Sequence, residues 1–413
     1  MKNIHLVCCL IVLCAFSFAM WESIGPYGGY LRAIAAAPSN EDIIYASAYT
    51  SPSPIVKTTN SGASWNRVTS INSYIFSMAV DPTNPDIVYA GGYMQIYKST
   101  NGGSSWTNHS VSNYYIYSLA VHPTSPSTVF AAGRVYTGSV YVMAFFKSTN
   151  SGSSWTSVNL SDSNGVSYSM AVDPYNPNNI YVGGYYYANS SYHPAVYKST
   201  NGGISFSEIS TGISSAGYYI YSLAVHPTTS NTIYAGTYYG GIYRTINGGS
   251  SWSLVSPSSY RYIFNMSTTI ARPNYIYASA DTCIYRSTNS GSNWSALSSG
   301  LIGTYNYGIH ARSDMVSQVY ASNNSGFYVS TNAGVNWTAS NQGITINGIT
   351  GFSSPHTSPA TIYTSFEGVG VFKTTNCGSD WNILPTPLTC GDICSFAFNN
   401  SNPNTLYALE GLG

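Results

Sequence analysis

Short apolar runs separated by Pro, Asn and Asp recur along most of the chain. The clearest example is Ser77–Pro82 followed by Ile87–Gly92, where a turn divides two apolar runs. Two such runs bounded by turn residues are typical of paired β-strands. The same layout recurs at Ala33–Ser47, Ser118–Gly133, Ser169–Gly184 and Ser222–Gly236, and more weakly at Ile270–Ala280, Ala311–Ser322, Phe352–Ser365 and Phe396–Leu409. The pattern predicts nine strand pairs, whose members we name strands a and b.

A polar motif follows eight of these strand pairs, and we call it the box. Its clearest copy is Ser99–Trp106: a hydroxyl residue, an Asn two positions on, a Gly, and an aromatic residue at the end. The step between copies varies from 41 residues (Asn60 to Asn101) to 51 residues (Asn150 to Asn201). The shared Asn residues are Asn60, Asn101, Asn150, Asn201, Asn247, Asn289, Asn332 and Asn376. The final aromatic residues are Trp65, Trp106, Trp155, Phe206, Trp252, Trp294, Trp337 and Trp381.

The chemistry of the box fits a tight turn between two strands. Asn folds its side chain onto nearby backbone amides, and Gly adopts positive φ without steric cost. The strand before each box and the strand that its aromatic residue opens, named c and d, bring each repeat to four strands. Four-stranded repeats of this length predict an all-β fold, a β-propeller. We expect eight complete box-bearing repeats and a partial ninth, with all boxes on one face of a ring.

The box resembles the Asp-box (BNR) repeat of sialidases, sortilin-type propellers, xyloglucan hydrolases and photosystem-assembly-factor-like propellers. The resemblance covers nearly all of the chain after residue 19 and implies a propeller fold. It does not choose a function, because those families include hydrolases and non-catalytic binders. The usual Asp is Asn in all eight copies here. The amide keeps the turn hydrogen bonds, but the box does not fit a charged or metal site.

The two ends of the chain carry further expectations. Met1–Ala19 has one Lys, an apolar run and the sequence Ser17-Phe-Ala19, the layout of a secretory signal peptide. We therefore expect export, with no membrane-spanning helix after cleavage, and a propeller over residues 20–413. Trp21–Ile24 reads as a lone strand d. Thr405–Leu409 reads as a ninth strand b after which strand c is missing, so we expect the protein to continue beyond Gly413. Parts of two propellers are the alternative.

Composition narrows the possible partners. Charged residues make up 7% of the chain and the formal net charge is zero, which argues against a nucleic-acid partner. Abundant aromatic residues argue against disorder. After signal cleavage four cysteines remain, Cys283, Cys377, Cys390 and Cys394, too few for a disulfide scaffold. A single clip between Cys390 and Cys394 is one possibility.

Tyrosine is concentrated in the loops expected opposite the boxes, between strands d and a and between strands b and c. Tyr joins a flat apolar ring to a hydroxyl at low conformational cost, which suits stacking against sugars or gripping a peptide. Packing inside the blades is the competing interpretation, and we expect about half of these rings in each place. The candidate ligand-binding residues are Tyr93, Tyr114, Tyr115, Tyr136, Tyr185, Tyr186, Tyr187, Tyr218, Tyr219, Tyr238, Tyr239, Tyr260 and Tyr262.

Acidic residues on the same face give the hydrolase alternative little support. Glycoside hydrolysis usually needs two carboxylates about 5–9.5 Å apart. The candidates are scattered over separate blades: Asp162, Glu208, Asp281, Glu367 and Asp392. The Arg cluster that a sialidase uses is also missing, since this face offers only Arg67, Arg134 and Arg261. On the opposite face Asp81, His122, Asp173 and His226 each precede Pro, and we interpret them as turn residues rather than metal ligands.

Three functions from different classes remain open. The first is a secreted or cell-surface, non-catalytic propeller whose Tyr-rich face binds a polysaccharide, a glycoprotein, a peptide or a cell-surface protein. The second is a glycoside hydrolase of the xyloglucan-hydrolase or sialidase type. The third is an extracellular structural protein that assembles with copies of itself. For the non-catalytic propeller we expect no metal and no cofactor, and we assign no catalytic residue.

Overall fold

The computed structural model describes residues 30–410, apart from 215–218, 257–261, 303–304, 343–348, 354–360, 367–369, 377–380, 385–392 and 400–401. All regular elements in this part of the chain are β-strands, and their pairing is antiparallel. The all-β prediction is therefore confirmed. Among these residues we find no helix with the length and apolar character needed to cross a membrane. The expected signal peptide and the lone strand at Trp21–Ile24 lie outside the described residues.

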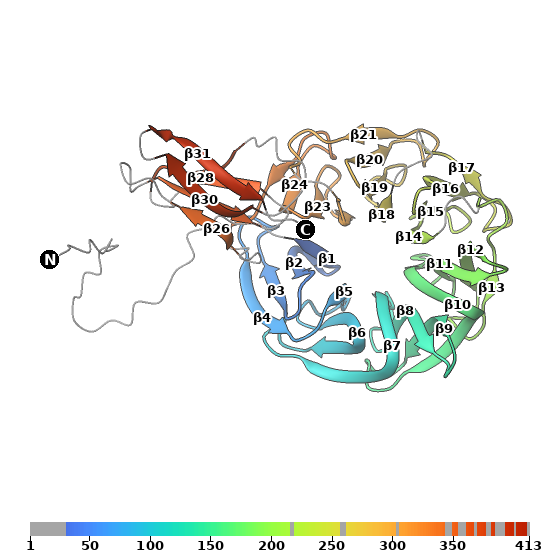
Figure 1. The fold of residues 1–413 in the computed structure, drawn as a ribbon. Helices are drawn as coiled ribbons and strands as arrows, with labels where there is room; N and C mark the ends of the chain where they lie inside the picture. The colour runs from blue at the N-terminus through green and yellow to red at the C-terminus, as the bar shows by residue number, and fades with distance from the viewer. Residues whose placement is uncertain are drawn as a thin grey trace.

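The first sheets form one side of a ring (Figure 1). The first sheet has four strands: β1 (Leu31–Ala37), β2 (Asn40–Ala48), β3 (Ser53–Thr58) and β4 (Asn66–Ile71). The next has nine: β5 (Ile75–Val80), β6 (Val88–Ser99), β7 (Thr107–Val121), β8 (Val129–Tyr136), β9 (Tyr141–Ser148), β10 (Thr156–Val172), β11 (Ile180–Ala188), β12 (Ser191–Ser199) and β13 (Ser207–Glu208).

The nine-stranded sheet is three blades joined through long strands. β7 pairs with β6 over Thr107–Ser110 and with β8 over Tyr114–Val121, so it serves as strand d of one blade and strand a of the next. β10 does the same between β9 and β11. β6 supplies strands b and c of its blade in one continuous element. The register thus divides this sheet into blades two, three and four.

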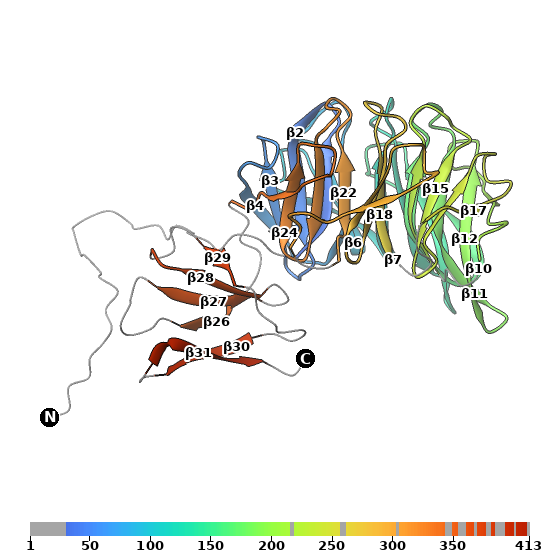
Figure 2. The same ribbon diagram turned by 90° about the horizontal axis from the view of Figure 1, so that it is seen from above.

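Three more four-stranded blades complete the ring. Blade five is β14 (Ile220–Val225), β15 (Ile233–Thr237), β16 (Ile242–Thr245) and β17 (Ser253–Leu254). Blade six is β18 (Ile263–Thr268), β19 (Ile276–Ala280), β20 (Ile284–Ser287) and β21 (Ser295–Leu297). Blade seven is β22 (Gly308–Ala311), β23 (Val319–Asn323), β24 (Gly326–Ser330) and β25 (Thr338–Ala339). Viewed from the side, the blades stand next to one another (Figure 2).

The ring closes between blade seven and blade one, and this corrects the expectation of eight boxes in one ring. β1 contacts β22 and β23. The Trp65 ring packs edge-on against Phe327, with centroids 4.8 Å apart, and Trp65 Nε1 donates to the Ser340 carbonyl at 3.0 Å. Arg312 of blade seven reaches Asp42 of blade one at 2.7 Å. These contacts fill the position that an eighth blade would need.

The remaining repeats lie outside the ring (Figure 1). A four-stranded sheet contains β26 (Ile349–Ser353), β27 (Ile362–Phe366), β28 (Gly370–Thr374) and β29 (Asn382–Ile383). A two-stranded sheet follows, made of β30 (Ile393–Asn399) and β31 (Asn402–Glu410). β31 includes the segment Thr405–Leu409 that the sequence predicts as a ninth strand b, and it pairs with β30 as expected.

The boxes use their Asn side chains to close each c–d turn. In the second box Ser99 Oγ donates to Asn101 Oδ1 at 3.0 Å and accepts from the Gly103 N–H at 2.9 Å. Asn101 Oδ1 also accepts from the Ser105 N–H at 2.9 Å. The Gly102 N–H then donates to the carbonyl of Asp86, in the a–b turn of the same blade, at 2.9 Å. Equivalent bonds join box and a–b turn in the other six blades of the ring, so these turns share one face.

In each of the seven blades of the ring, the box aromatic residue packs against strand b of the preceding blade. Trp106, for example, lies in one apolar cluster with Tyr45. Phe206 is the exception among the box residues, and the residue that it meets on strand b is also an exception, Phe130 instead of Tyr. The other pairs in shared clusters are Trp155 with Tyr89, Trp252 with Tyr181, Trp294 with Tyr234, Trp337 with Tyr277 and Trp65 with Tyr320. The core is therefore divided into layers between blades.

Candidate functional site

A β-bulge in strand a turns one side chain of nearly every blade toward the channel. In blade two the register shifts between Ile75 and Ser77, which leaves Phe76 without a paired residue. Bulges re-aim side chains in this way. The same shift isolates Arg32, Tyr117, Tyr168, Tyr221 and Phe264. In blade seven Tyr307 takes the corresponding place directly before β22, where its N–H donates to the Ser322 carbonyl.

Glycine on strand b makes room for the bulge. A Cβ atom on Gly133 would lie 1.7 Å from the Tyr115 carbonyl oxygen, and one on Gly184 would lie 1.9 Å from that of Val166. No side chain fits at such distances. Gly92, Gly133 and Gly184 on strand b of blades two to four therefore allow the backbone of strand a to come close and bulge.

The aligned side chains form a closed circle of aromatic rings around the channel mouth. Successive rings meet at centroid distances of 5.0 Å for Phe76–Tyr117, 5.3 Å for Tyr117–Tyr168 and 4.7 Å for Tyr168–Tyr221. Tyr30 and Tyr49 complete the circle beside Arg32, since Tyr30 contacts Tyr307 at 5.0 Å and Tyr49 at 5.5 Å. We call this set the aromatic circle: Tyr30, Tyr49, Phe76, Tyr117, Tyr168, Tyr221, Phe264 and Tyr307.

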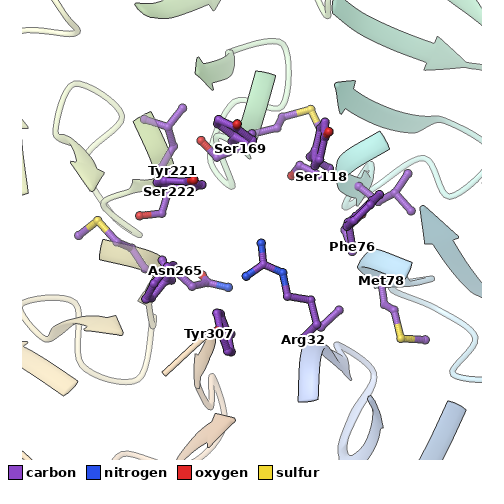
Figure 3. Close-up of a pocket in the computed structure, with 18 of the residues that line it drawn as sticks. Arg32, Phe76, Met78, Ser118, Ser169, Tyr221, Ser222, Asn265 and Tyr307 are labelled. Atoms are coloured by element: carbon purple, nitrogen blue, oxygen red, sulfur yellow. The ribbon is translucent and has the colours of Figure 1, made fainter. Parts of the chain in front are cut away.

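Arg32 projects into the middle of this circle (Figure 3). Its guanidinium carbon lies 4.9 Å from the Tyr307 ring centroid and 5.9 Å from that of Tyr49, within the range of cation–π contacts. Side chains of the circle and the residues that follow them on strand a line a cavity of about 270 Å³. Arg32 is the one charged residue among the described residues that line it.

A second layer of tyrosines surrounds the circle on the b–c and d–a loops, and together they form what we call the tyrosine face. Of the predicted ligand-binding residues, Tyr93, Tyr136, Tyr187 and Tyr239 are exposed, each with 39–45% of its surface accessible. Tyr115, Tyr185, Tyr186, Tyr219, Tyr238 and Tyr262 are half-buried. Tyr218, Tyr260 and the side chain of Tyr114 lie outside the described residues.

None of the described candidates belongs to the buried core. The fully buried tyrosines lie instead on strand b, such as Tyr45, Tyr89 and Tyr181, with Tyr328 on strand c of blade seven. The outer rings support one another: Tyr185 meets Tyr219 at 4.3 Å, and Tyr238 meets Tyr262 at 4.5 Å. The expected even division between surface and core therefore does not hold for these loops. Their rings pack edge to edge and still leave part of each ring accessible.

Burial keeps the inner hydroxyls neutral. It raises the pKa of Tyr117 to about 12 and also raises the pKa values of Tyr168 and Tyr307. The face thus offers neutral hydroxyls and ring surfaces at physiological pH. Its other described cation at the rings is Arg134, whose guanidinium carbon lies 4.1 Å from the Tyr115 centroid and 4.5 Å from that of Tyr141.

The carboxylates proposed for hydrolysis are spread over the ring. Asp162 and Glu208 are exposed, in blades three and four, and Asp281 belongs to blade six. Burial raises the pKa of Tyr197, and the negative charges of Glu208 and Asp162 add to this effect. Glu367 and Asp392 lie outside the described residues.

The Asp and His residues of the a–b turns hold those turns together. Asp81 Oδ1 accepts from the N–H groups of Thr83 at 2.8 Å and Asn84 at 3.1 Å, and Asp173 makes the equivalent bonds. His122 and His226 use Nδ1 in the same way. Among the described residues no group of three or more His, Cys, Asp or Glu side chains is placed to hold a metal ion. The turn interpretation accounts for these four residues.

Sequence reasoning missed the residues that form the mouth of the channel. Arg32, Phe76, Tyr221 and Phe264 were not among the candidates, and neither was the exposed Tyr49. The sequence does place Tyr74, Tyr192 and Tyr305, which are also exposed, in the tyrosine-carrying d–a and b–c loops. A signal was present. In blades two to six an aromatic residue precedes Ser or Asn and then Met or Leu, as in Phe76-Ser-Met78 and Tyr221-Ser-Leu223. Aromatic residues that occupy the same position of strand a in successive blades of a ring gather around its axis.

Comparison with known proteins supports the fold. No protein-family model and no curated protein matches the sequence. A GH74 xyloglucanase from Xanthomonas campestris aligns with a TM-score of 0.67 at 13% identity, over 92% of this chain and 71% of that one. An ancestral GH74 enzyme aligns with a TM-score of 0.71 at 20% identity, over 96% of this chain and 60% of that one.

A third similar structure belongs to another class of protein. YCF48 bound to D1 peptide aligns with a TM-score of 0.54 at 13% identity, over 74% of this chain and 93% of that one. Identities this low establish a shared fold and nothing about activity. The ring of four-stranded antiparallel blades and the fold of its structural neighbours together identify the chain as a β-propeller.

Proposed function

We propose that this protein is a secreted or cell-surface, non-catalytic propeller that binds a carbohydrate chain across its tyrosine face. The observation that carries the proposal is the continuous layer of half-exposed tyrosine rings around the channel mouth. Stacked rings with neutral hydroxyls match the apolar faces and hydroxyl groups of sugars. Monomeric proteins rarely expose aromatic patches of this kind without a binding role. The predicted signal peptide at residues 1–19 supplies the proposed location.

A glycoside hydrolase is the second candidate. Two of the similar structures are GH74 enzymes, and Asp162 and Glu208 supply two carboxylates from neighbouring blades. Hydrolysis needs an acid with a raised pKa beside a second carboxylate. Asp162 and Glu208 are both exposed and belong to different blades. Binding without turnover is therefore the better supported function.

We also propose that β26–β31 belong to a second propeller unit. They repeat the box-bearing pattern outside the ring: Thr374 Oγ1 donates to Asn376 Oδ1 at 2.8 Å. Lys373 Nζ lies 5.4 Å from the Tyr363 ring centroid, as Lys57 does from Tyr45 in blade one at 5.2 Å. This chain spans 71% and 60% of the lengths of the two GH74 enzymes.

A glycan array and a reducing-end assay, run on the same preparation, test the proposal. Binding to one class of glycan with no release of reducing ends is the expected result. Turnover that is lost in Asp162→Asn and Glu208→Gln would establish the hydrolase instead. Absence of glycan binding together with concentration-dependent assembly would favour the structural-protein alternative. Binding to peptides but not to glycans would show that the tyrosine face recognises a protein partner.

A further inference from the structure

We infer that the channel mouth is a carboxylate-binding subsite, in which Arg32 recognises one uronate unit of an acidic glycan. The inference rests on the proposed glycan-binding function and makes it more specific. It names the charge of the ligand and the part of the tyrosine face that reads this charge. The residue at the centre of the aromatic circle is Arg32 (Figure 3).

Arg32 is the exception in a set of equivalent positions. The other six blades place Phe or Tyr at this point of strand a, and blade one places a cation there. Tyr30 and Tyr49 already close the circle beside it, and an aromatic residue at this position would remove the charge from the channel. The guanidinium is therefore not needed to close the ring.

Arg32 also lacks a counter-ion in the described part of the chain. The ion pairs found there join Lys57, His310 and Arg312 to carboxylates, and none involves Arg32. Its neighbours are the Tyr307 and Tyr49 rings. Arg312 shows the contrast, since it is paired with both Asp42 and Asp314. A half-buried cation that is surrounded by rings gains from an anion that replaces lost hydration.

The cavity limits the size and charge of that anion. Its volume of about 270 Å³ is slightly below the roughly 300–1,000 Å³ of pockets that enclose drug-sized ligands. It therefore fits one unit of a longer chain, with the neighbouring units on the tyrosine face. One lining cation matches one negative charge, and the planar fork of guanidinium pairs with a carboxylate through two parallel hydrogen bonds. A uronate combines that carboxylate with a ring that stacks on tyrosine.

The experiment compares ligands that differ only in this charge. Oligosaccharides of galacturonate and of mannuronate are titrated calorimetrically beside their methyl esters, against the wild-type chain and three variants. Arg32→Gln removes the cation. Arg32→Tyr removes it and supplies the residue type that other blades use, so folding is maintained. Arg134→Gln is the matched control, because Arg134 is the second cation stacked on tyrosines of this face.

The wild-type chain should bind at least one acid oligosaccharide about tenfold or more tighter than its ester, as expected of a charge-assisted pair. Both Arg32 variants should abolish this preference and keep the ester affinity, while Arg134→Gln should preserve it. Equal binding of acid and ester by the wild type, or a preference that survives in both Arg32 variants, would overturn the uronate inference but not the proposed glycan-binding function. Failure to bind acid, ester or any array glycan would overturn the proposed function with it.

The C-terminus of a peptide is another source of a carboxylate, and a series of peptides distinguishes it from a uronate. Tyrosine-rich and neutral peptides with a free C-terminus are compared with their amidated forms under the same conditions. A preference for the free C-terminus that depends on Arg32, without any preference among the oligosaccharides, would assign the subsite to a protein ligand and contradict the uronate assignment.

Discussion

At the scale of single residues, the box depends on an amide that is both donor and acceptor. Asn101 Oδ1 accepts from Ser99 Oγ and from the Ser105 N–H, while Nδ2 donates to Ser105 Oγ at 2.9 Å. The first five boxes repeat the bond from Nδ2 to a Ser hydroxyl. A carboxylate in place of the amide keeps the two accepted bonds and reverses the third, since the Ser hydroxyl is able to donate.

Replacement of Asn101 tests this account of the box. Asn101→Ala should lower the free energy of unfolding by about 1 kcal/mol, as the loss of a capping side chain does. Asn101→Asp should stay within about 0.5 kcal/mol of wild type. Urea denaturation followed by tryptophan fluorescence measures both. A larger loss for Asp than for Ala would show that the Nδ2 donor, and not the accepted bonds, holds the turn.

At the scale of elements, basic side chains join neighbouring blades. Lys98 Nζ of strand c donates to the Ser151 carbonyl in the box of the next blade at 3.0 Å, and Arg286 Nη1 donates to that of Ala333 at 2.6 Å. Blade seven has Val329 at the matching position of strand c. Arg312 replaces the missing cation from the a–b turn, where it bonds to Ser61 Oγ in the first box at 3.0 Å. Closure of the ring therefore depends on a different residue from the other joints.

Removal of Arg312 should weaken the ring more than removal of an equivalent cation between interior blades. Arg312→Met breaks bonds to Asp42, Asp314 and Tyr320. We expect a loss of roughly 1.5–3 kcal/mol, the range for hydrogen bonds to charged groups. Arg286→Met, the control, removes one bond to a carbonyl and should cost about 1 kcal/mol. Thermal melts of both variants provide the comparison, and equal losses would contradict a special role for the closing joint.

The same joint should make the ring sensitive to acid. Burial alone would raise the pKa of Glu41, but the hydrogen bond and charge of His310, with bonds from Ser313, hold it below its ordinary value. Bonds from Ser61 and Arg312 lower the pKa of Asp42, and Arg312 lowers that of Asp314. A carboxylate whose pKa is lowered on folding stabilises the folded state at pH values above its ordinary pKa, which is 4.5 for Glu41 and 3.8 for the two Asp residues. That stability is lost as the pH falls below them, and Glu41→Gln should reduce the slope of melting temperature against pH in that range.

The sequence was informative about elements and less so about the geometry between them. Strand pairs and boxes could be read from local patterns, because each is set by residues close together in the chain. The number of blades in the ring could not. Closure depends on contacts such as Trp65 with Phe327 and Arg312 with Asp42, which join residues far apart in sequence. The aromatic circle was missed for the same reason, since its members meet only after the ring has closed.

At the scale of the whole molecule, buried tyrosines link stability to alkaline pH. Burial is the main cause that raises the pKa values of Tyr89, Tyr181 and Tyr277 from 10.0 to about 12. A raised folded-state pKa gives stability that is complete below pH 10 and is lost as the pH rises toward 12. Tyrosine ionisation and strand circular dichroism should therefore change together in that window. Ionisation of the strand-b tyrosines near pH 10, with the strands intact, would contradict their burial.

The tyrosine face is the central claim, and it is tested most directly by comparing tyrosines on opposite faces of the ring. Tyr187 and Tyr192 are 41% and 38% exposed on the tyrosine face, and Tyr175 is 71% exposed in an a–b turn on the box face. On a glycan array, Tyr187→Ala and Tyr192→Ala should each weaken binding by about 1–3 kcal/mol, roughly 5- to 150-fold. Tyr175→Ala should bind as wild type does, and all three should melt as wild type does. Equal binding by all four proteins, or equal losses in the three variants, would contradict a ligand-binding role for the tyrosine face.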